Sequence, residues 1–174
     1  QIIEDLEQEV MSARLLPIST IFATLPRAVR ELARETSKEI DLVLEGETTE
    51  LDRKIIEALN DPLLHLIRNA VDHGIEAPDA REQKGKPRQG TIRVSAQAMG
   101  AFAQVRVHDD GRGMRPEYIR QKAIQKGLIT ADEANTLDER QSLNLIFLPG
   151  FSTKSEISEV SGRGVGMDVV RTNI

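Results

Sequence analysis

The sequence predicts an α+β fold, in which helices and one β-hairpin pack together without a repeating βαβ pattern. Amphipathic spacing of apolar residues predicts helices within the first 36 residues and again over residues 51–74. Alternating apolar and polar residues at 91–98 and 102–109, separated by a turn that contains Gly100, predict the hairpin. Because these segments do not alternate as regular βαβ units, a doubly wound parallel sheet is not expected.

Composition narrows the classes of function. The 174 residues are 39% apolar, enough for a single core, and 29% charged. A net charge of −5 and an aromatic content of 3% disfavour nucleic-acid binding. The absence of Cys excludes disulfides, zinc–thiolate sites and cysteine nucleophiles. No apolar run approaches a membrane span and no signal peptide is visible, so a cytoplasmic location is expected.

The first third of the chain should supply two helices, a strand and a short third helix. Residues 1–16 are predicted to be a helix that begins without a cap, so we expect the chain to continue upstream. Pro17 should end or bend this helix, and a second helix should follow at 18–36. Ile40–Leu44 is predicted to be a short strand and Leu51–Leu59 a short helix.

Residues Asn60–Gly74 are predicted to form the helix around which the rest of the chain is organised. Asn60 or Asp61 can cap it, and Pro62 fits its first turn. Gly74 can end it. At about 100° per residue, apolar residues fill one arc of this helix and polar residues the other, so one face can pack on a sheet.

The polar face of this helix combines a carboxamide, two imidazoles, a guanidinium and a carboxylate, from His65, Arg68, Asn69, Asp72 and His73. A solvated face is the commoner explanation for a polar arc on a helix. This arc, however, lacks Lys and Glu and carries groups that ligate hard metal ions and contact phosphates. Taken alone, the helix supports the two interpretations equally.

The segment after this helix leads into the hairpin. Residues 75–90 are rich in Pro, Gly and charge and are predicted to be a surface loop containing about one helical turn. Alternate residues of a strand share a face, so Asp109 should point inward if Val105 and Val107 reach the core.

The motif Asp109–Gly113 directly follows the second strand. A simple turn is the commonest explanation for such a sequence. A buried carboxylate nevertheless needs a donor, which the exocyclic amine of adenine supplies and guanine does not. Gly111 and Gly113 would let the backbone approach such a base closely.

The C-terminal third is predicted to contain helices at 115–127 and Thr130–Arg140 and a second glycine-rich motif, Gly162–Gly166, that runs into a helix. Free amides and the positive end of a helix suit phosphate binding, although a flexible loop explains the motif equally well. It lacks the Gly-Lys-Ser/Thr of a Walker loop and the preceding strand of a dinucleotide fingerprint. Ser152 and Lys154 could close over phosphates or form an exposed polar loop.

Together these segments resemble a known family in both order and spacing. The run from His65 to Asn69 resembles the N box of the GHKL superfamily of ATPases and kinases. Asp109–Gly113 resembles its first glycine box, and Gly162–Gly166 its second. Longer segments over nearly the whole chain resemble the catalytic domain of CheA-type chemotaxis histidine kinases: HLIRNAVDHGIE, KGKPRQGTI, VHDDGRGM, LIFLPGFSTK and SGRGVGMDVV.

The resemblance implies a two-layer α/β sandwich, the GHKL or Bergerat ATP-binding fold, with helices on one face of a mixed sheet. Residues 1–16 would be the end of a dimerisation helix and its linker, and residues 17–174 a C-terminally incomplete ATP-binding catalytic domain. With Mg²⁺, this domain would transfer the γ-phosphoryl of ATP to a histidine on a separate phosphotransfer domain, in chemotaxis-type two-component signalling. The implied partners are response regulators, a chemoreceptor, a coupling protein and a second copy of the full-length protein, without nucleic acid or membrane insertion.

The same resemblance implies roles for individual residues. Asn69 would hold Mg²⁺ through its carboxamide, and His65 would lie near the transferring phosphoryl group. Arg68 and His73 would contact phosphates, and Asp109 would bind adenine. His65, Arg68 and Asn69 would form the catalytic set. The other implied nucleotide-binding positions are Asp72, Gly111, Gly113, Ser152, Lys154, Gly162, Gly164, Val165 and Gly166.

Two alternatives stay open. GHKL ATPases of the gyrase, chaperone or mismatch-repair kind use a carboxylate to activate water, and His65 stands where many of these carry Glu. A non-catalytic scaffold is disfavoured by the presence of Asn69, Asp109 and the three loop glycines. The chain offers no candidate phosphoacceptor, because its only other histidines, His73 and His108, lie in or beside the implied site. The accepting histidine is expected on another domain or chain.

Overall fold

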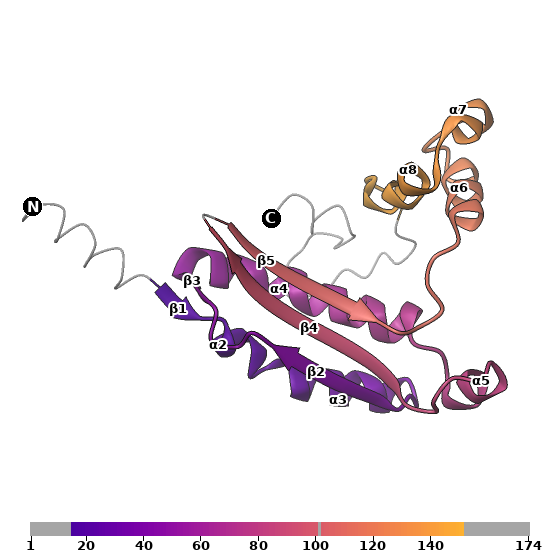
Figure 1. Cartoon of the computed structure of the whole chain (residues 1–174). Coiled ribbons are helices and arrows are strands. Elements are labelled where there is room, and N and C mark those ends of the chain that lie inside the picture. The colour runs from indigo at the N-terminus through magenta and orange to yellow at the C-terminus, as the bar shows by residue number, and fades with distance from the viewer. Residues whose placement is uncertain (1–14, 101, 152–174) are drawn as a thin grey trace, which may run out of the picture. The chain divides into compact units, whose positions relative to one another are not determined.

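A computed structural model describes residues 15–100 and 102–151 of the chain, which divides into two compact units, Gln1–Arg112 and Gly113–Ile174 (Figure 1). The predicted helix at 1–14 and the second glycine-rich motif lie outside the described residues. The two units are described separately below.

The first unit is built on a three-stranded mixed sheet in the order β2-β4-β5 (Figure 1). β2 (Ile40–Glu45) runs parallel to β4 (Gly90–Met99), and β4 pairs antiparallel with β5 (Phe102–Asp109). The predicted strand and hairpin are therefore confirmed. In the register of the hairpin, Asp109 lies opposite Ile92 of the central strand.

Two helices, α3 (Leu25–Glu35) and α4 (Arg53–Asn69), lie along one face of this sheet, which makes the unit a two-layer α/β sandwich as predicted (Figure 1). Their inward side chains meet those of the central strand in one core, because both helices present an apolar stripe to the sheet. The fully buried members of that core include Phe22, Leu25, Ile67, Val71, Ile92 and Val94.

The start of the described chain differs from the sequence prediction. Leu15–Pro17 forms β1, which pairs antiparallel with β3 (Glu50–Asp52), so helix at 15–16 and at 51–52 was wrongly predicted. The predicted helix at 18–36 is divided into α2 (Ser19–Phe22) and α3, with Pro26 in the first turn of α3. A proline lacks the backbone donor of a helix interior and is tolerated in a first turn, which accounts for the division.

The two helices predicted at 51–59 and 60–74 are one helix, α4. Asp52 caps its start by accepting from the backbone N of Lys54 at 2.8 Å, so the proposed caps Asn60 and Asp61 were wrong. Pro62 lies buried inside the helix. The buried apolar stripe continues on both sides of this proline, and its packing outweighs the helical hydrogen bond that Pro62 removes.

A π-helical turn, η1 (Ala70–Gly74), continues α4 and ends at the predicted residue. Ile75 N donates to Ala70 O at 2.8 Å, the wider hydrogen bond of a π-helix. The wider turn carries one more residue than an α-helical turn, so the wheel drawn at 100° per residue holds only as far as Asn69. Asp72 and His73 leave the helix in directions that this wheel does not give.

Residues 75–90 contain the helix α5 (Pro78–Gln83) where about one helical turn was predicted, but the segment does not lie wholly on the surface. Ile75, Glu76, Pro78 and Arg81 are buried. High charge and proline content usually mark exposed loops, but here two charges of opposite sign are buried together, so neither lacks a partner.

The second unit, where described, contains three short helices and a 3₁₀ turn: α6 (Pro116–Gln125), α7 (Ala131–Thr136), α8 (Glu139–Asn144) and η2 (Leu145–Phe147). Thr130 caps α7, but Asp138 begins a new capping box, which divides the helix predicted at 130–140. A small core of Ile119, Ala123, Leu145 and Phe151 holds this unit together.

Candidate functional site

The end of the organising helix and the end of the hairpin lie in contact in the first unit. A Cβ atom on Gly74 would lie only 2.7 Å from Asp109 Oδ1, and one on Gly111 would lie 2.1 Å from Gly74 O. Arg112 N donates to Gly74 O at 2.9 Å. Two stretches that are far apart in the sequence, 60–74 and 109–112, therefore form one local structure.

Asp109 ends β5 on the side that packs against the core. Val105 and Val107 pack against the core as predicted, and Asp109, on the same face, is half-buried at the edge of that core. Its Oδ1 accepts a hydrogen bond from Gly111 N at 3.0 Å. This bond holds the carboxylate in a fixed orientation at the junction with η1.

The polar residues of α4 are exposed to different degrees. His65 and Asn69, one helical turn apart, are half-buried, whereas Arg68 is exposed. In η1, Asp72 is half-buried and His73 is exposed. Asn69 is the last residue of α4, so its carboxamide lies at the start of the π-helical turn that meets Asp109.

The local backbone structure by itself explains why glycine occupies both positions of the first glycine box, Gly111 and Gly113. Gly111 packs so closely on Gly74 that any side chain would overlap a backbone carbonyl. Gly113, the first residue of the second unit, has a φ of 67°, which L-residues with side chains rarely adopt. The contact of either residue with a base, expected from the sequence, stays a prediction.

Lys38 also fixes the π-helical turn, through two of its backbone carbonyls. Lys38 was not identified from the sequence. Its Nζ donates to Val71 O and, at 3.1 Å, to Asp72 O. Burial lowers the pKa of Lys38 below its ordinary value, while the nearby carboxylate of Asp72 opposes that shift. No local pattern marks Lys38, because its acceptors lie more than 30 residues away in the chain.

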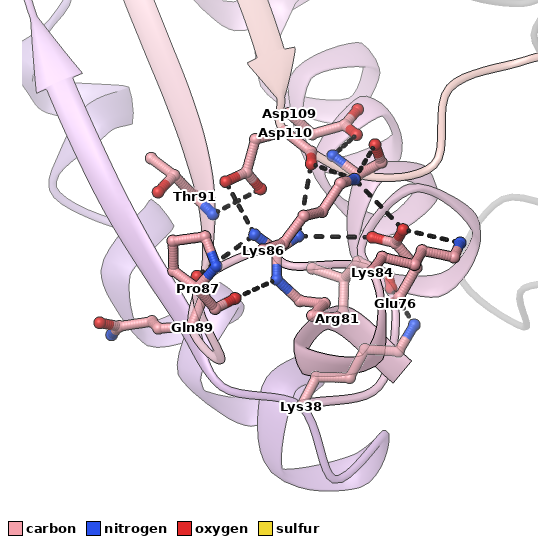
Figure 2. A network of polar contacts seen from close by, with 12 residues as sticks. Lys38, Glu76, Arg81, Lys84, Lys86, Pro87, Gln89, Thr91, Asp109 and Asp110 are labelled. Atoms are coloured by element: carbon pink, nitrogen blue, oxygen red, sulfur yellow. Dashed lines mark hydrogen bonds and ion pairs between the residues drawn. The ribbon is translucent and has the colours of Figure 1, made fainter. Parts of the chain in front are cut away.

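A polar network lies below the Asp109 loop and was also missed (Figure 2). Glu76 is 4% exposed and forms ion pairs with Arg81, Lys84 and Lys86 at 3.2–3.3 Å. Burial by itself would raise the pKa of Glu76. Hydrogen bonds from its own backbone amide and from the two lysines outweigh burial and lower the pKa to about 2. Glu76 is therefore ionised at neutral pH.

Six of the predicted nucleotide-binding positions are not placed. Ser152, Lys154, Gly162, Gly164, Val165 and Gly166 lie outside the described residues. Within the described part of the chain, no cluster of three or more acidic or His side chains could hold a metal ion. In the same part, no helix is both long enough and apolar enough to cross a bilayer.

The chain is similar to one protein family and to several characterised proteins over most of its length. Residues 58–174 match the family described as histidine kinase-, DNA gyrase B- and HSP90-like ATPases. A gliding motility regulatory protein of Myxococcus xanthus is 52% identical over 165 residues, which cover 95% of this chain and 21% of that protein.

Two further relatives carry the names CheAY and CheA. The sensor histidine kinase CheAY of Helicobacter pylori is 48% identical over 170 residues, which cover 98% of this chain and 21% of that protein. The chemotaxis protein CheA of Bacillus subtilis is 47% identical over 170 residues, which cover 98% of this chain and 25% of that protein. The chain thus spans a quarter or less of the length of these relatives.

Proposed function

Because the chain belongs to the histidine kinase-, DNA gyrase B- and HSP90-like ATPases and, within them, to the CheA type, we propose that it is the ATP-binding catalytic domain of a protein histidine kinase. The γ-phosphoryl of ATP passes to a histidine on a separate phosphotransfer domain and then to a response regulator. The observation that supports this proposal most strongly is the contact between the N-box helix end at Gly74 and the strand end at Asp109.

We assign the adenine contact to Asp109. Among the described residues, Oδ1 accepts from Gly111 N, and no donor to Oδ2 is found. A half-buried carboxylate with an acceptor to spare suits an exocyclic amine, whereas the carbonyl of guanine at that place would leave both acceptors facing one another.

We assign the magnesium contact to Asn69. The chemistry of its side chain fits, because a carboxamide oxygen is a hard ligand and Mg²⁺ at nucleotide sites is usually held by one or two side chains together with substrate phosphates. An ion at Asn69 would share its coordination with the phosphates of ATP in this way. When bound, Mg²⁺ supplies charge neutralisation on the transferring phosphoryl group.

The remaining residues of the N-box helix orient and neutralise the phosphates. Arg68 and His73 are both exposed, as contacts to a charged ligand require, and His65 faces the same side of α4 as Asn69. The other proposed nucleotide contacts are Asp72, Gly111, Gly113, Ser152, Lys154, Gly162, Gly164, Val165 and Gly166. Lys154 lies in the proposed lid, and the glycines of the second box surround the triphosphate.

The proposed setting is that of the CheA-type relatives. Residues 1–16 belong to the end of a dimerisation helix and its linker, and the full-length protein is a cytoplasmic homodimer. A chemoreceptor and a coupling protein control it through a further domain, and it acts on its own phosphotransfer domain or on that of its dimer partner.

The test is to incubate the full-length protein with ATP labelled at the γ-phosphate. We expect label on a histidine of the protein, and we expect the label to disappear when magnesium is removed with a chelator. Label released only as free phosphate would show an ATPase that activates water and would overturn the kinase assignment. Absence of both products from a protein that still binds ATP would indicate a non-catalytic scaffold.

A further inference from the structure

Arg81 is completely buried on α5, outside the N box and both glycine boxes. Its Nε donates to Pro87 O at 2.7 Å, and its Nη2 donates to Gln89 O at 3.4 Å and to Asp110 Oδ2 at 2.9 Å. Its Nη1 donates to Asp110 O and to Glu76 Oε2, both at 3.3 Å (Figure 2). The guanidinium thus contacts both the carboxylate and the carbonyl of Asp110, the residue that follows Asp109.

Asp110 transmits this contact to the central strand. Its Oδ1 accepts from Thr91 N at 2.9 Å, and its own N donates to Thr91 O at 3.2 Å. Because Oδ2 is held by Arg81 and Oδ1 by β4, the side chain of Asp110 cannot rotate. Because Asp110 directly follows Asp109, these bonds fix the backbone from which the Asp109 side chain projects.

Lys86 also holds the carbonyl of Asp110, together with the carbonyl of Gly111. Its Nζ donates to Asp110 O at 3.0 Å and to Gly111 O at 2.8 Å, and it pairs with Glu76 (Figure 2). Gly111 in turn donates its N–H to Asp109 Oδ1. A continuous set of hydrogen bonds therefore runs from α5 and the loop after it to the carboxylate of Asp109.

The hydrogen bonds and ion pairs of Arg81 and Lys86 are better suited to fixing the orientation of their partners than to stabilising the fold. A buried ion pair contributes little to stability compared with apolar side chains of the same volume, because desolvation offsets the attraction. Its geometry is nevertheless narrow, since a planar guanidinium binds a carboxylate in few orientations. The buried Arg81 and its partners are thus suited to fixing the direction of a neighbouring group.

We propose that Arg81 is a positioning residue for recognition of the base: through Asp110, and with Lys86, it holds the Asp109 carboxylate in the orientation that distinguishes adenine from guanine. This proposal rests on the proposed function, because it presumes that Asp109 contacts the base. Arg81 itself touches no nucleotide.

The test measures selectivity as well as affinity. Dissociation constants for ATP and for GTP, both with Mg²⁺, are determined by calorimetry on the full-length protein and on its Arg81→Lys variant. Lys keeps the charge but cannot reproduce the fork-shaped contact to Asp110. We expect ATP to bind about tenfold more weakly and GTP to change little, so that the ratio of the two constants falls about tenfold.

Arg88→Lys is the matched control. Arg88 lies in the same charged segment, residues 75–90, as Arg81, and its side chain is 47% exposed. Its ion pairs are with Glu39, Asp79 and Glu82, and none is with Asp110. If the loss of any arginine from this segment changed the ratio of the two dissociation constants, both variants would show the change. Loss of the positioning role changes the ratio only in Arg81→Lys.

Each outcome supports or overturns the proposal. If the unchanged protein shows no preference for ATP over GTP, the Asp109 assignment fails, and this inference fails with it. If the unchanged protein discriminates and a folded Arg81→Lys variant keeps the same ratio, the positioning role alone is overturned. Should Arg81→Lys not fold, Lys86→Gln decides in the same way, because Lys86 is partly exposed and holds the same loop. An unaltered ratio in that variant overturns the proposal.

Discussion

At the scale of single residues, the proposed recognition of adenine depends on how the Asp109 carboxylate is held. Its carboxylate is oriented by Gly111 N, which is part of its own loop, and by the fixed neighbour Asp110. The negative charge and the accepting lone pairs are both available at the surface of the junction. Replacing the charge while keeping the shape therefore separates recognition from folding.

We predict that Asp109→Asn lowers ATP affinity about tenfold with little change in stability, because a charge-assisted hydrogen bond is lost. Calorimetric titration of the full-length protein with ATP and Mg²⁺ measures the change. Asp79→Asn serves as the control, since Asp79 is 82% exposed and pairs only with Arg88 among the described residues. Equal affinity of the Asp109 variant and the unchanged protein would contradict the adenine assignment.

The lowered pKa of Glu76 predicts that the stability of the folded protein depends on pH. Its pKa falls from 4.5 to about 2 in the folded protein, so the ionised form stabilises the fold. That stabilisation is complete above pH 4.5 and is lost as the pH falls from 4.5 to about 2. Urea unfolding should therefore show a drop of about 3 kcal/mol in this window that is smaller in a Glu76→Gln variant. An identical acid dependence in both proteins would show that Glu76 carries no such linkage.

At the scale of elements, the π-helical turn and the strand end are fitted to each other. The closest atom to a Cβ on Gly74 is the Asp109 carboxylate oxygen, which can be displaced at the cost of its hydrogen bond to Gly111 N. The closest atom to a Cβ on Gly111 is a backbone oxygen, which cannot move without the chain. The same small addition should therefore have different consequences at the two glycines.

We predict that Gly74→Ala displaces the Asp109 carboxylate and lowers ATP affinity about tenfold, at a cost in stability below about 1 kcal/mol. Gly111→Ala should instead lower the free energy of unfolding by about 3 kcal/mol, because backbone must move. Neither glycine has a φ in the left-handed region, so an added Cβ acts through these contacts and not through backbone strain. Titration and thermal unfolding of the two variants check this, and unaltered ATP binding by Gly74→Ala would argue against the junction as the site.

Local periodicity was sufficient to predict the hairpin and the inward face of β5, because the side chains of a strand alternate whatever the rest of the chain does. It failed where long-range packing decides. The sequence predicts Pro62 in the first turn of a helix, but the apolar side chains buried before and after it keep α4 continuous. The pairing of Arg81 with Asp110 joins residues 29 apart, and nothing in the charged segment 75–90 distinguishes a buried guanidinium from an exposed one.

The candidate site was predictable to a similar extent. Asn69 and Asp109 stand in recognisable motifs, and their segments come together as the motifs imply. Lys38 and Arg81 hold those segments from outside any motif, through backbone carbonyls and a neighbouring carboxylate. Such contacts depend on where the chain returns in space, which spacing along the sequence does not give.

At the scale of the whole molecule, the chain corresponds to one domain of relatives that are about four to five times as long. The first unit holds the N box and the start of the first glycine box within one core. The proposed kinase activity adds the second glycine box to these two and requires all three to surround one triphosphate.

The most direct test of this account is a structure of the full-length protein with a non-hydrolysable ATP analogue and Mg²⁺. We predict that the amine of the adenine ring lies within hydrogen-bonding distance of Asp109, and that the metal lies between the carboxamide of Asn69 and the phosphates. A nucleotide bound elsewhere, or one whose base lies away from the strand end at Asp109, would contradict the account.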